Sequence, residues 1–230
     1  MKRDIALPLM IVAAFALGCS QLSELGSSNS PAAPNSNAAS PGTSPATADR
    51  AGAISPSGDP AADINSMADR FLAERSFRAK MTGKGDKDFR TDLEFVAPDR
   101  FHMRTGPGLE TVIIGKDVYL SMGDSWQKMP GGLGSSVPDL RAAFDKEGRK
   151  WFSDVRFVGE ETVDGVPALV YQYKNRGAGN AGENDSKIWI SKADGLPLKL
   201  EATYKSGTLR SMLIEYEYDP NIKIEVPKTK

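Results

Sequence analysis

The chain has 230 residues, with 29 Lys or Arg against 30 Asp or Glu, so its formal net charge is −1. A near-neutral chain is not typical of nucleic-acid binding proteins, which carry a basic patch and usually have a high pI. One cysteine and one histidine exclude an internal disulfide and a zinc site built from His and Cys ligands.

The first 18 residues have the pattern of an export signal. Lys2 and Arg3 are followed by an apolar run from Ile5 to Leu17, which is shorter than the roughly 20 apolar residues of a transmembrane helix. The sequence Ala16-Leu17-Gly18-Cys19 then resembles the lipobox of bacterial lipoproteins. We therefore expect residues 1–18 to be a signal peptide and Cys19 to carry a covalent diacylglyceryl anchor. The alternative is an ordinary secretory signal with an incidental cysteine.

Residues 20–58 consist almost wholly of Ser, Ala, Pro, Gly, Asn and Thr. Such a segment cannot bury enough apolar surface to offset its ordering entropy, so we expect 19–58 to be a lipidated, disordered tether. Its root-mean-square reach would be roughly 35 Å. The folded domain is expected over 59–230.

The domain is predicted to open with a helix over 60–74. Asp59 offers an N-cap and Pro60 the first helical residue. The helical spacing of apolar residues then predicts one buried stripe, formed by Ile64, Met67, Ala68, Phe71 and Leu72.

Most of the remaining chain alternates apolar and polar residues with a period of two, which predicts strands. These strands are expected near 77–81, 89–95, 101–103, 109–114, 117–122, 125–129, 151–158, 166–174, 187–192, 197–205, 208–218 and 222–226. Short Gly-containing turns between them, such as Asp164-Gly165 and Ser206-Gly207, predict antiparallel hairpins.

The hairpin turns also predict registers. A turn at Ala97-Pro98-Asp99 would place Phe95 opposite Phe101 and Leu93 opposite Met103, with Asp92 facing Arg104 and Glu94 facing His102. A turn at Ser206-Gly207 would place Leu200 opposite Leu213 and Tyr204 opposite Leu209. That register puts Ile214 and Tyr216 on the other face, so it needs a β-bulge near 213 or burial of both faces.

A second helix is predicted over 138–146, with Pro138 in its first turn and Phe144 on its apolar face. It follows a Gly-rich stretch over 131–136, which lacks the Lys-Ser/Thr pair of a phosphate-binding loop and is interpreted as a flexible lid. A second flexible loop is expected over 175–186.

The sequence offers no catalytic motif. His102 lies in a strand pattern, where a solvated side chain is expected rather than a general base, because no Ser, Cys or Asp motif accompanies it. The carboxylates form neither a recognisable acid/base pair nor a calcium loop. We therefore expect no enzyme activity, no catalytic residue, no metal site and no cofactor beyond the anchor at Cys19.

Apolar surface remains as the candidate functional feature. A sheet with one apolar face and few covering helices indicates a groove or cavity. Methionines at 67, 81, 103, 122, 129 and 212 would adapt to irregular apolar ligands, although each could simply fill the core.

Five segments together resemble the lipoprotein-carrier superfamily of the LolA and LolB type, including the LppX/LprG-like lipoproteins. They are PDRFHMRT (98–105), TVIIGKDVYLSMGDSWQKMP (111–130), FVGEETVDGVPALVYQY (157–173), KIWISKADGLPLKLEATY (187–204) and NIKIEVP (221–227). The resemblance implies an α+β, mostly β fold: a strongly bent antiparallel half-barrel of about 10–11 strands with a few helices in its concave face. It also implies an apolar cavity for acyl chains. Its candidate lining is Met67, Phe71, Phe89, Leu93, Phe95, Phe101, Met103, Trp126, Phe144 and Trp189.

These features predict a non-catalytic, membrane-anchored lipoprotein that binds or carries lipid or lipoprotein acyl chains. The alternative is an envelope protein-interaction or sensor lipoprotein with the same fold and no lipid cargo. Expected partners are membrane lipid through the Cys19 anchor, acyl chains and an envelope protein, but no nucleic acid. Ser20 after the cysteine favours the periplasmic face of the outer membrane.

Overall fold

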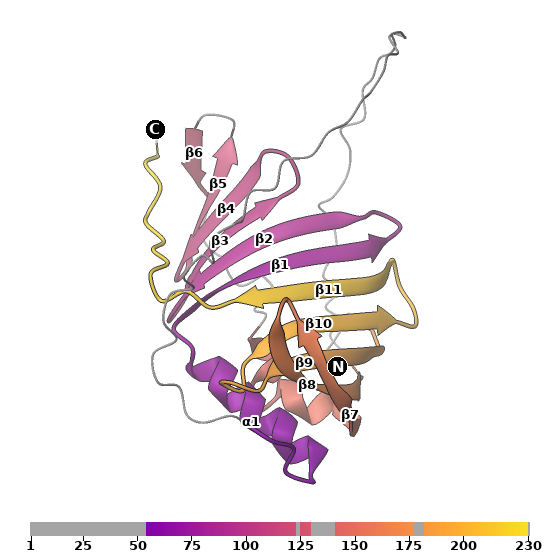
Figure 1. The fold of residues 1–230 in the computed structure, drawn as a ribbon. Coiled ribbons are helices and arrows are strands. Elements are labelled where there is room, and N and C mark those ends of the chain that lie inside the picture. The colour runs from indigo at the N-terminus through magenta and orange to yellow at the C-terminus, as the bar shows by residue number, and fades with distance from the viewer. Residues whose placement is uncertain (1–53, 123–124, 130–140, 177–181, 230) are drawn as a thin grey trace, which may run out of the picture. The chain divides into compact units, whose positions relative to one another are not determined.

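The computed structural model describes residues 54–122, 125–129, 141–176 and 182–229. Within these ranges the chain forms one α-helix, two 3-10 turns and eleven strands (Figure 1). The helices are α1 (Pro60–Ala73), η2 (Ala142–Phe144) and η3 (Gly148–Trp151). The strands are β1 (Ser76–Gly85), β2 (Phe89–Val96), β3 (Arg100–Thr105), β4 (Leu109–Ile114), β5 (Asp117–Met122), β6 (Ser125–Lys128), β7 (Phe152–Val163), β8 (Val166–Asn175), β9 (Asn184–Ser191), β10 (Pro197–Tyr204) and β11 (Leu209–Glu217).

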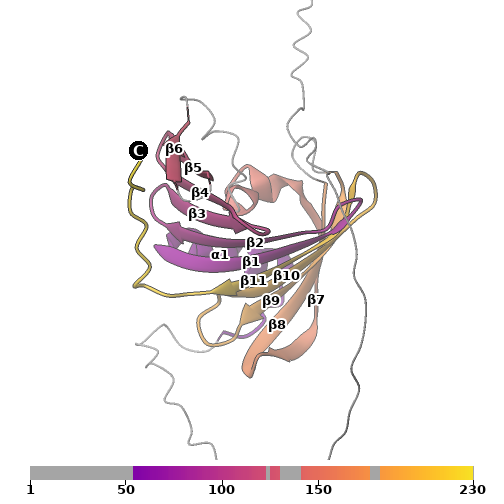
Figure 2. The ribbon, with the colours of Figure 1, turned by 90° about the horizontal axis from the view of Figure 1, so that it is seen from above.

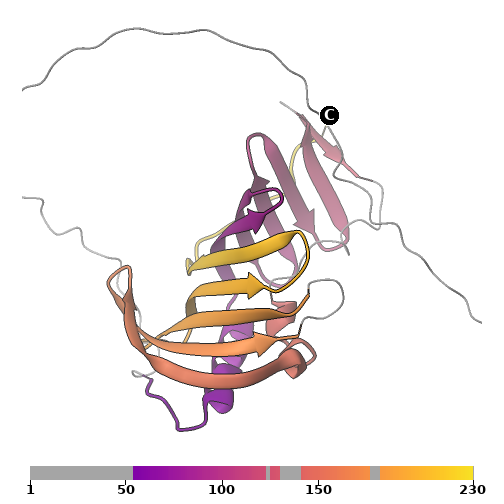
Figure 3. The same ribbon diagram turned by 90° about the vertical axis from the view of Figure 1, so that its right-hand side faces the viewer.

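All eleven strands belong to one antiparallel sheet with the order β6-β5-β4-β3-β2-β1-β11-β10-β9-β8-β7. The sheet therefore consists of two meanders, β1–β6 and β7–β11, which the pairing of β1 with β11 joins. The sheet is bent and open, with β6 and β7 as its edges (Figure 3). The predicted mostly β, bent antiparallel sheet is confirmed.

Helix α1 forms as the sequence predicts. The Asp59 carboxylate accepts hydrogen bonds from the backbone N–H groups of Ala61 and Ala62, at 3.0 and 3.1 Å, and Pro60 occupies the first turn. The predicted stripe is buried at Ile64, Met67, Ala68 and Phe71. Ordered contacts begin before the helix: the Ile54 N–H donates to the Lys192 carbonyl at 2.7 Å, and the Ile54 side chain packs on the core.

The helix predicted over 138–146 does not form as one helix: in its described part only Ala142–Phe144 is helical, as the 3-10 turn η2 with Phe144 buried, and 138–140 lie outside the described residues. Instead, η2 and η3 flank Asp145, whose carboxylate accepts hydrogen bonds from the N–H groups of Glu147 and Gly148 at 2.8 and 2.7 Å. A side chain that bonds the local backbone in this way competes with helical hydrogen bonding and interrupts the helix.

The register of β2 and β3 is the predicted one, with Phe95 opposite Phe101, Leu93 opposite Met103 and Glu94 opposite His102. The predicted register of β10 and β11 is wrong by one residue, because Leu200 pairs with Ile214 and Ala202 with Met212. This shift places Ile214 and Tyr216 on the same face as Leu200, so burial of the apolar set decides the register.

The strand predicted near 222–226 is also wrong. This segment is an extended tail whose alternate residues Ile222 and Ile224 are buried against Val112 and Tyr119. Its residues are buried alternately, as in a strand, but they do not pair with a neighbouring strand. Further along the tail an isolated bridge joins Thr229 to Trp126.

The sheet has two different faces. The inner face packs against α1 and carries Phe77, Ala79, Leu93, Phe95, Tyr171, Ile188, Leu200, Ile214 and Tyr216. The outer face carries the alternate residues, which are mostly charged on β1, β2 and β3. The Phe71 ring lies at the centre of the core, with centroids 5.0 Å from Phe77 and 5.4 Å from both Phe144 and Tyr216.

We expect Phe71→Ala to lower the free energy of unfolding by about 3–5 kcal/mol, because a fully buried ring is replaced by a cavity. Urea unfolding followed by circular dichroism measures this loss. Phe157→Ala is the matched control, since that ring is 36% exposed and should cost less than half as much. Equal losses for the two variants would contradict the assigned core.

Candidate functional site

The part of the inner face under α1 is filled by side chains. Met67, Phe71 and Phe144 pack from the helical side against Leu93 and Phe95, and all five are between 0 and 2% exposed. These five predicted cavity residues therefore meet in one place, where they form the protein core and leave no surface free for a ligand.

The inner face continues beyond α1 as apolar surface that is only partly covered. Phe101, Met103, Met81 and Met212 are half-buried at the margin of the core. Further along the same face, Phe89 and Leu109 are 37% and 48% exposed.

The Phe89 ring lies against the neighbouring strand at Gly83, its partner in β1. A Cβ at Gly83 would stand 2.0 Å from Cε1 of the Phe89 ring, so only glycine allows this contact. The ring therefore extends the apolar surface over β1 although it belongs to β2.

Trp126 and Trp189 were predicted to line the same cavity, and the structure places both on the outer face. Trp189 lies opposite Val170 and packs with Val163 and Leu198. The ammonium groups of Lys187 and Lys199 lie 4.4 and 4.5 Å from the centre of its ring, so these lysines help to cover an outer-face tryptophan.

Trp126 packs against the cluster that the tail covers, with Val112, Tyr119, Ile222 and Ile224. Both tryptophans therefore lie away from the inner face. The sequence does not show which face of the sheet each tryptophan occupies. Apolar residues lie on both faces of β9, which holds Trp189, and of β4, against which Trp126 packs.

Arg141 is an inner-face residue that no sequence pattern indicated. It borders a small pocket of about 130 Å³ between α1 and the β2–β3 turn, with Leu72, Phe95, Pro98 and Phe101. Its guanidinium lies 4.7 Å from the centre of the Phe95 ring and donates to the Leu72 carbonyl in the last turn of α1. It therefore joins η2 to the end of the helix.

Four tyrosines contribute hydroxyl groups to the inner face. The Tyr171 hydroxyl donates to the Asp63 carboxylate at 2.7 Å, and burial followed by this carboxylate raises the pKa of Tyr171. Burial also raises the pKa values of Tyr173, Tyr204 and Tyr216. These hydroxyls therefore stay neutral at physiological pH.

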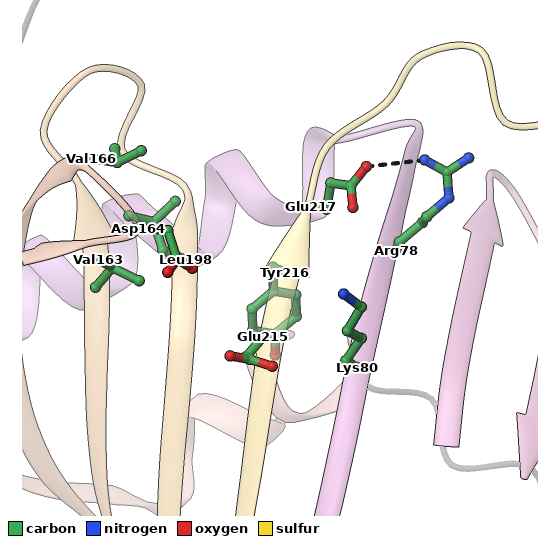
Figure 4. A pocket seen from close by; sticks show the side chains of 9 residues that line it. All are labelled: Arg78, Lys80, Val163, Asp164, Val166, Leu198, Glu215, Tyr216 and Glu217. Carbon is green, nitrogen blue, oxygen red and sulfur yellow. Dashed lines mark hydrogen bonds and ion pairs between the residues drawn. The ribbon is translucent and has the colours of Figure 1, made fainter. Parts of the chain in front are cut away.

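The outer face is charged, and Arg78 organises much of it. Its guanidinium donates to Glu94, Glu217 and Asp219 at 3.1, 3.2 and 2.9 Å, which ties β1 to β2, β11 and the start of the tail. An open pocket of about 280 Å³ lies beside it, with Val163, Val166 and Leu198 along one wall (Figure 4).

His102 belongs to the same charged surface. Its ring nitrogens lie 3.3 Å from Glu94 and 3.0 Å from Glu110, and its side chain is only 16% exposed. The sequence predicted a solvated histidine, whereas the structure holds it between two carboxylates.

Within the described residues, no group of three or more His, Cys, Asp and Glu side chains is arranged to hold a metal ion. The same ranges include no helix long and apolar enough to cross a bilayer. The predicted anchor at Cys19, the tether up to residue 53 and the Gly-rich stretch over 131–136 lie outside them.

This architecture, a single open, bent antiparallel sheet around one α-helix, is the LolA-like fold that the sequence motifs resemble. The crystal structure of the Mycobacterium tuberculosis lipoprotein LppX matches with a TM-score of 0.59 at 13% identity, over 74% of this chain and 100% of LppX. LprF from Mycobacterium bovis matches with a TM-score of 0.54 at 13% identity, over 76% of this chain and 99% of LprF. No family model and no curated protein matches the sequence. At this identity the likeness concerns the fold alone.

We expect Arg78→Gln to lower the free energy of unfolding by about 1 kcal/mol at pH 7, since a partly exposed cation loses three carboxylate partners. Lys80→Gln on the same strand is the control. Lys80 has no ion pair among the described residues, and its removal should change stability by less than about 0.5 kcal/mol.

The loss should depend on pH in a defined direction. Burial opposes ionisation of Glu94, but its bonds to Arg78 and His102 outweigh this and lower the pKa of Glu94. A lowered carboxyl pKa stabilises the folded state above the unfolded pKa and ceases to do so as pH falls through the folded one. Urea unfolding should therefore show the Arg78→Gln deficit shrinking as pH falls below about 4; a deficit that grows on acidification would contradict this assignment.

Proposed function

We propose that the protein is a non-catalytic, membrane-anchored lipoprotein that binds acyl chains of a lipid or a lipoprotein on its inner face. The observation that carries this proposal is the apolar strip beyond α1. There Phe89, Met103 and Leu109 stay partly exposed although they share a face with the core. An acyl chain laid along this strip would gain about 0.8 kcal/mol for each CH₂ removed from water.

The polarity of the surroundings supports an apolar ligand. Beside Met103 and Leu109 on this face lie Thr91 and Thr105, whose hydroxyls bond each other at 3.0 Å. Satisfied neutral groups of this kind border an acyl chain without leaving a buried charge unpaired.

The proposed cellular location rests on the fold and on the lipobox. The fold is shared with two structures that are described as lipoproteins. Together with the lipobox at Cys19, this supports a cell-envelope location outside the cytoplasm, with Ser20 favouring the outer membrane. The anchor would act with the tether to let the domain meet its ligand at a membrane.

Native mass spectrometry with lipid extraction tests the proposal, on the full chain carrying Cys19→Ala so that its own anchor contributes no lipid. We expect a bound lipid at a defined stoichiometry. Met103→Asp and Leu109→Asp should each reduce its occupancy at least tenfold, because a carboxylate would then lie on the apolar strip. Leu109 is exposed enough for its variant to fold, and circular dichroism checks both.

Val226→Asp is the matched control, since it adds the same charge at an exposed apolar residue of the tail. Its lipid occupancy should equal that of the parent chain. A lipid-free mass before and after incubation with envelope lipids, or unchanged occupancy in both inner-face variants, would overturn the proposal in favour of a protein-interaction or sensor lipoprotein.

A further inference from the structure

The strands of the sheet end in two sets of turns that differ in character. The turns β1–β2, β3–β4, β8–β9 and β10–β11 lie at one end, which we call the rim. The β1–β2 and β10–β11 turns lie side by side there (Figures 1 and 2). The opposite end carries the turns β2–β3, β4–β5, β7–β8 and β9–β10, and α1 contacts it where Arg70 donates to the Asp194 carbonyl.

Three of the six large exposed apolar side chains of the described residues lie at the rim; the others are Phe157 and Val158 within β7 and Val226 in the tail. Phe89 begins β2, Leu109 begins β4, and Trp151 immediately precedes β7, where its carbonyl accepts from the N–H of Arg176. Their exposed fractions are 37%, 48% and 44%. Phe89 and Leu109 also belong to the apolar strip of the inner face, so this strip runs out to the rim.

The rim is also the basic end of the sheet. Its described turn residues, 84–90, 104–110, 174–176, 182–184 and 204–210, include eight Lys or Arg and four Asp or Glu. With Asp154, which pairs with Lys174 at 2.6 Å, the excess is three positive charges.

The opposite end has the reverse balance. Its turn residues, 97–100, 114–117, 163–166, 191–197 and 217–219, include three basic and six acidic side chains, an excess of three negative charges. The near-neutral chain therefore carries a charge difference along its strands, and Phe89, Leu109 and Trp151 lie at the positive end.

We propose that the rim is a docking surface for an anionic lipid bilayer. Phe89, Leu109 and Trp151 enter the interfacial region, while basic side chains of the turns contact lipid phosphates. Exposed apolar residues beside basic ones are the two elements of peripheral membrane binding. Tryptophan is favoured at this depth of a bilayer because its ring is amphipathic.

This docking rests on the proposed acyl-binding function and gives it a direction. A bilayer at the rim would meet the apolar strip end-on, so that an acyl chain passes between lipid and protein without crossing water. The acidic end would face away from the anionic surface.

Vesicle flotation tests the docking, with the full chain carrying Cys19→Ala. The probes are phosphatidylcholine vesicles and vesicles with 30% phosphatidylglycerol, which we chose to supply negative charge. We expect at least tenfold tighter binding to the anionic vesicles, weakened by salt as exposed charge interactions are. The double variant Lys87→Glu/Arg210→Glu should bind at least tenfold more weakly, and Leu109→Ser/Trp151→Ser at least fivefold.

The control for net charge is Lys116→Glu/Lys223→Glu, which changes the chain charge equally at exposed residues away from the rim. It should stay within about threefold of the parent. Equal losses in the rim and control variants, or no preference for anionic vesicles, would overturn the proposal.

Native mass spectra of the same variants separate the two proposals. Lipid that co-purifies with the rim charge variant while its vesicle binding is lost supports both docking and acyl binding. Rim-dependent vesicle binding by a chain that never holds lipid supports docking and overturns acyl binding. Co-purified lipid together with rim-independent vesicle binding overturns docking and leaves acyl binding standing.

Discussion

The pairing of β1 with β11 is the contact on which the rest of the structure depends. It joins two local meanders into one sheet, with Arg78 opposite Glu217 and Met81 opposite Ile214. The strands are distant in sequence, so the chain must close a long loop before this contact is gained. Aromatic packing offsets the entropy cost of closing this loop, because Phe77 of β1 and Tyr216 of β11 both contact the Phe71 ring of α1. Arg78 adds charged bonds across the same junction on the outer face.

The same junction determines where the inner face is closed. Phe71 packs α1 against the junction of β1 and β11, and Arg70 bonds α1 to the β9–β10 turn. Helix α1 therefore lies over β1 and the β7–β11 meander. Helix α1 buries Leu93 and Phe95 near the C-terminal end of β2. It covers less of the inner face toward Met103 and Leu109. The apolar strip is partly exposed because the sheet is wider than the one helix that packs on it.

The sequence predicted those strand registers that depend on regular alternation of apolar and polar residues. The register of β2 and β3 followed from apolar and charged pairs that agree on both faces. Alternation failed where both faces are apolar: β9 is buried at nearly every residue, so the side of Trp189 could not be read. The tail at Ile222 and Ile224 shows the converse, since burial of alternate residues produced a strand pattern without a strand partner.

The candidate site was predicted only as a set of apolar residues, and the structure divides that set. Met67, Phe71, Phe144, Leu93 and Phe95 belong to the core, whereas Phe89, Phe101 and Met103 remain at its margin. Nothing in a strand pattern separates these groups, because exposure depends on how far α1 reaches across the sheet. Gly83 is the one local signal, since a glycine inside a strand indicates a close approach that Phe89 fills.

The distribution of charge gives the site its surroundings. Outer-face charges are largely matched where they stand: Lys187 binds Glu161, Lys192 binds Glu160 and Lys199 binds Glu201, each within 2.9 Å. Inner-face polar groups such as Tyr173 and Tyr216 are neutral because burial raises their pKa values. At the rim Lys84 and Lys205 are paired with Asp88 and Glu183, whereas Lys87 and Arg210 form no ion pair among the described residues. The excess charge of the rim acts on whatever approaches the open end of the apolar strip.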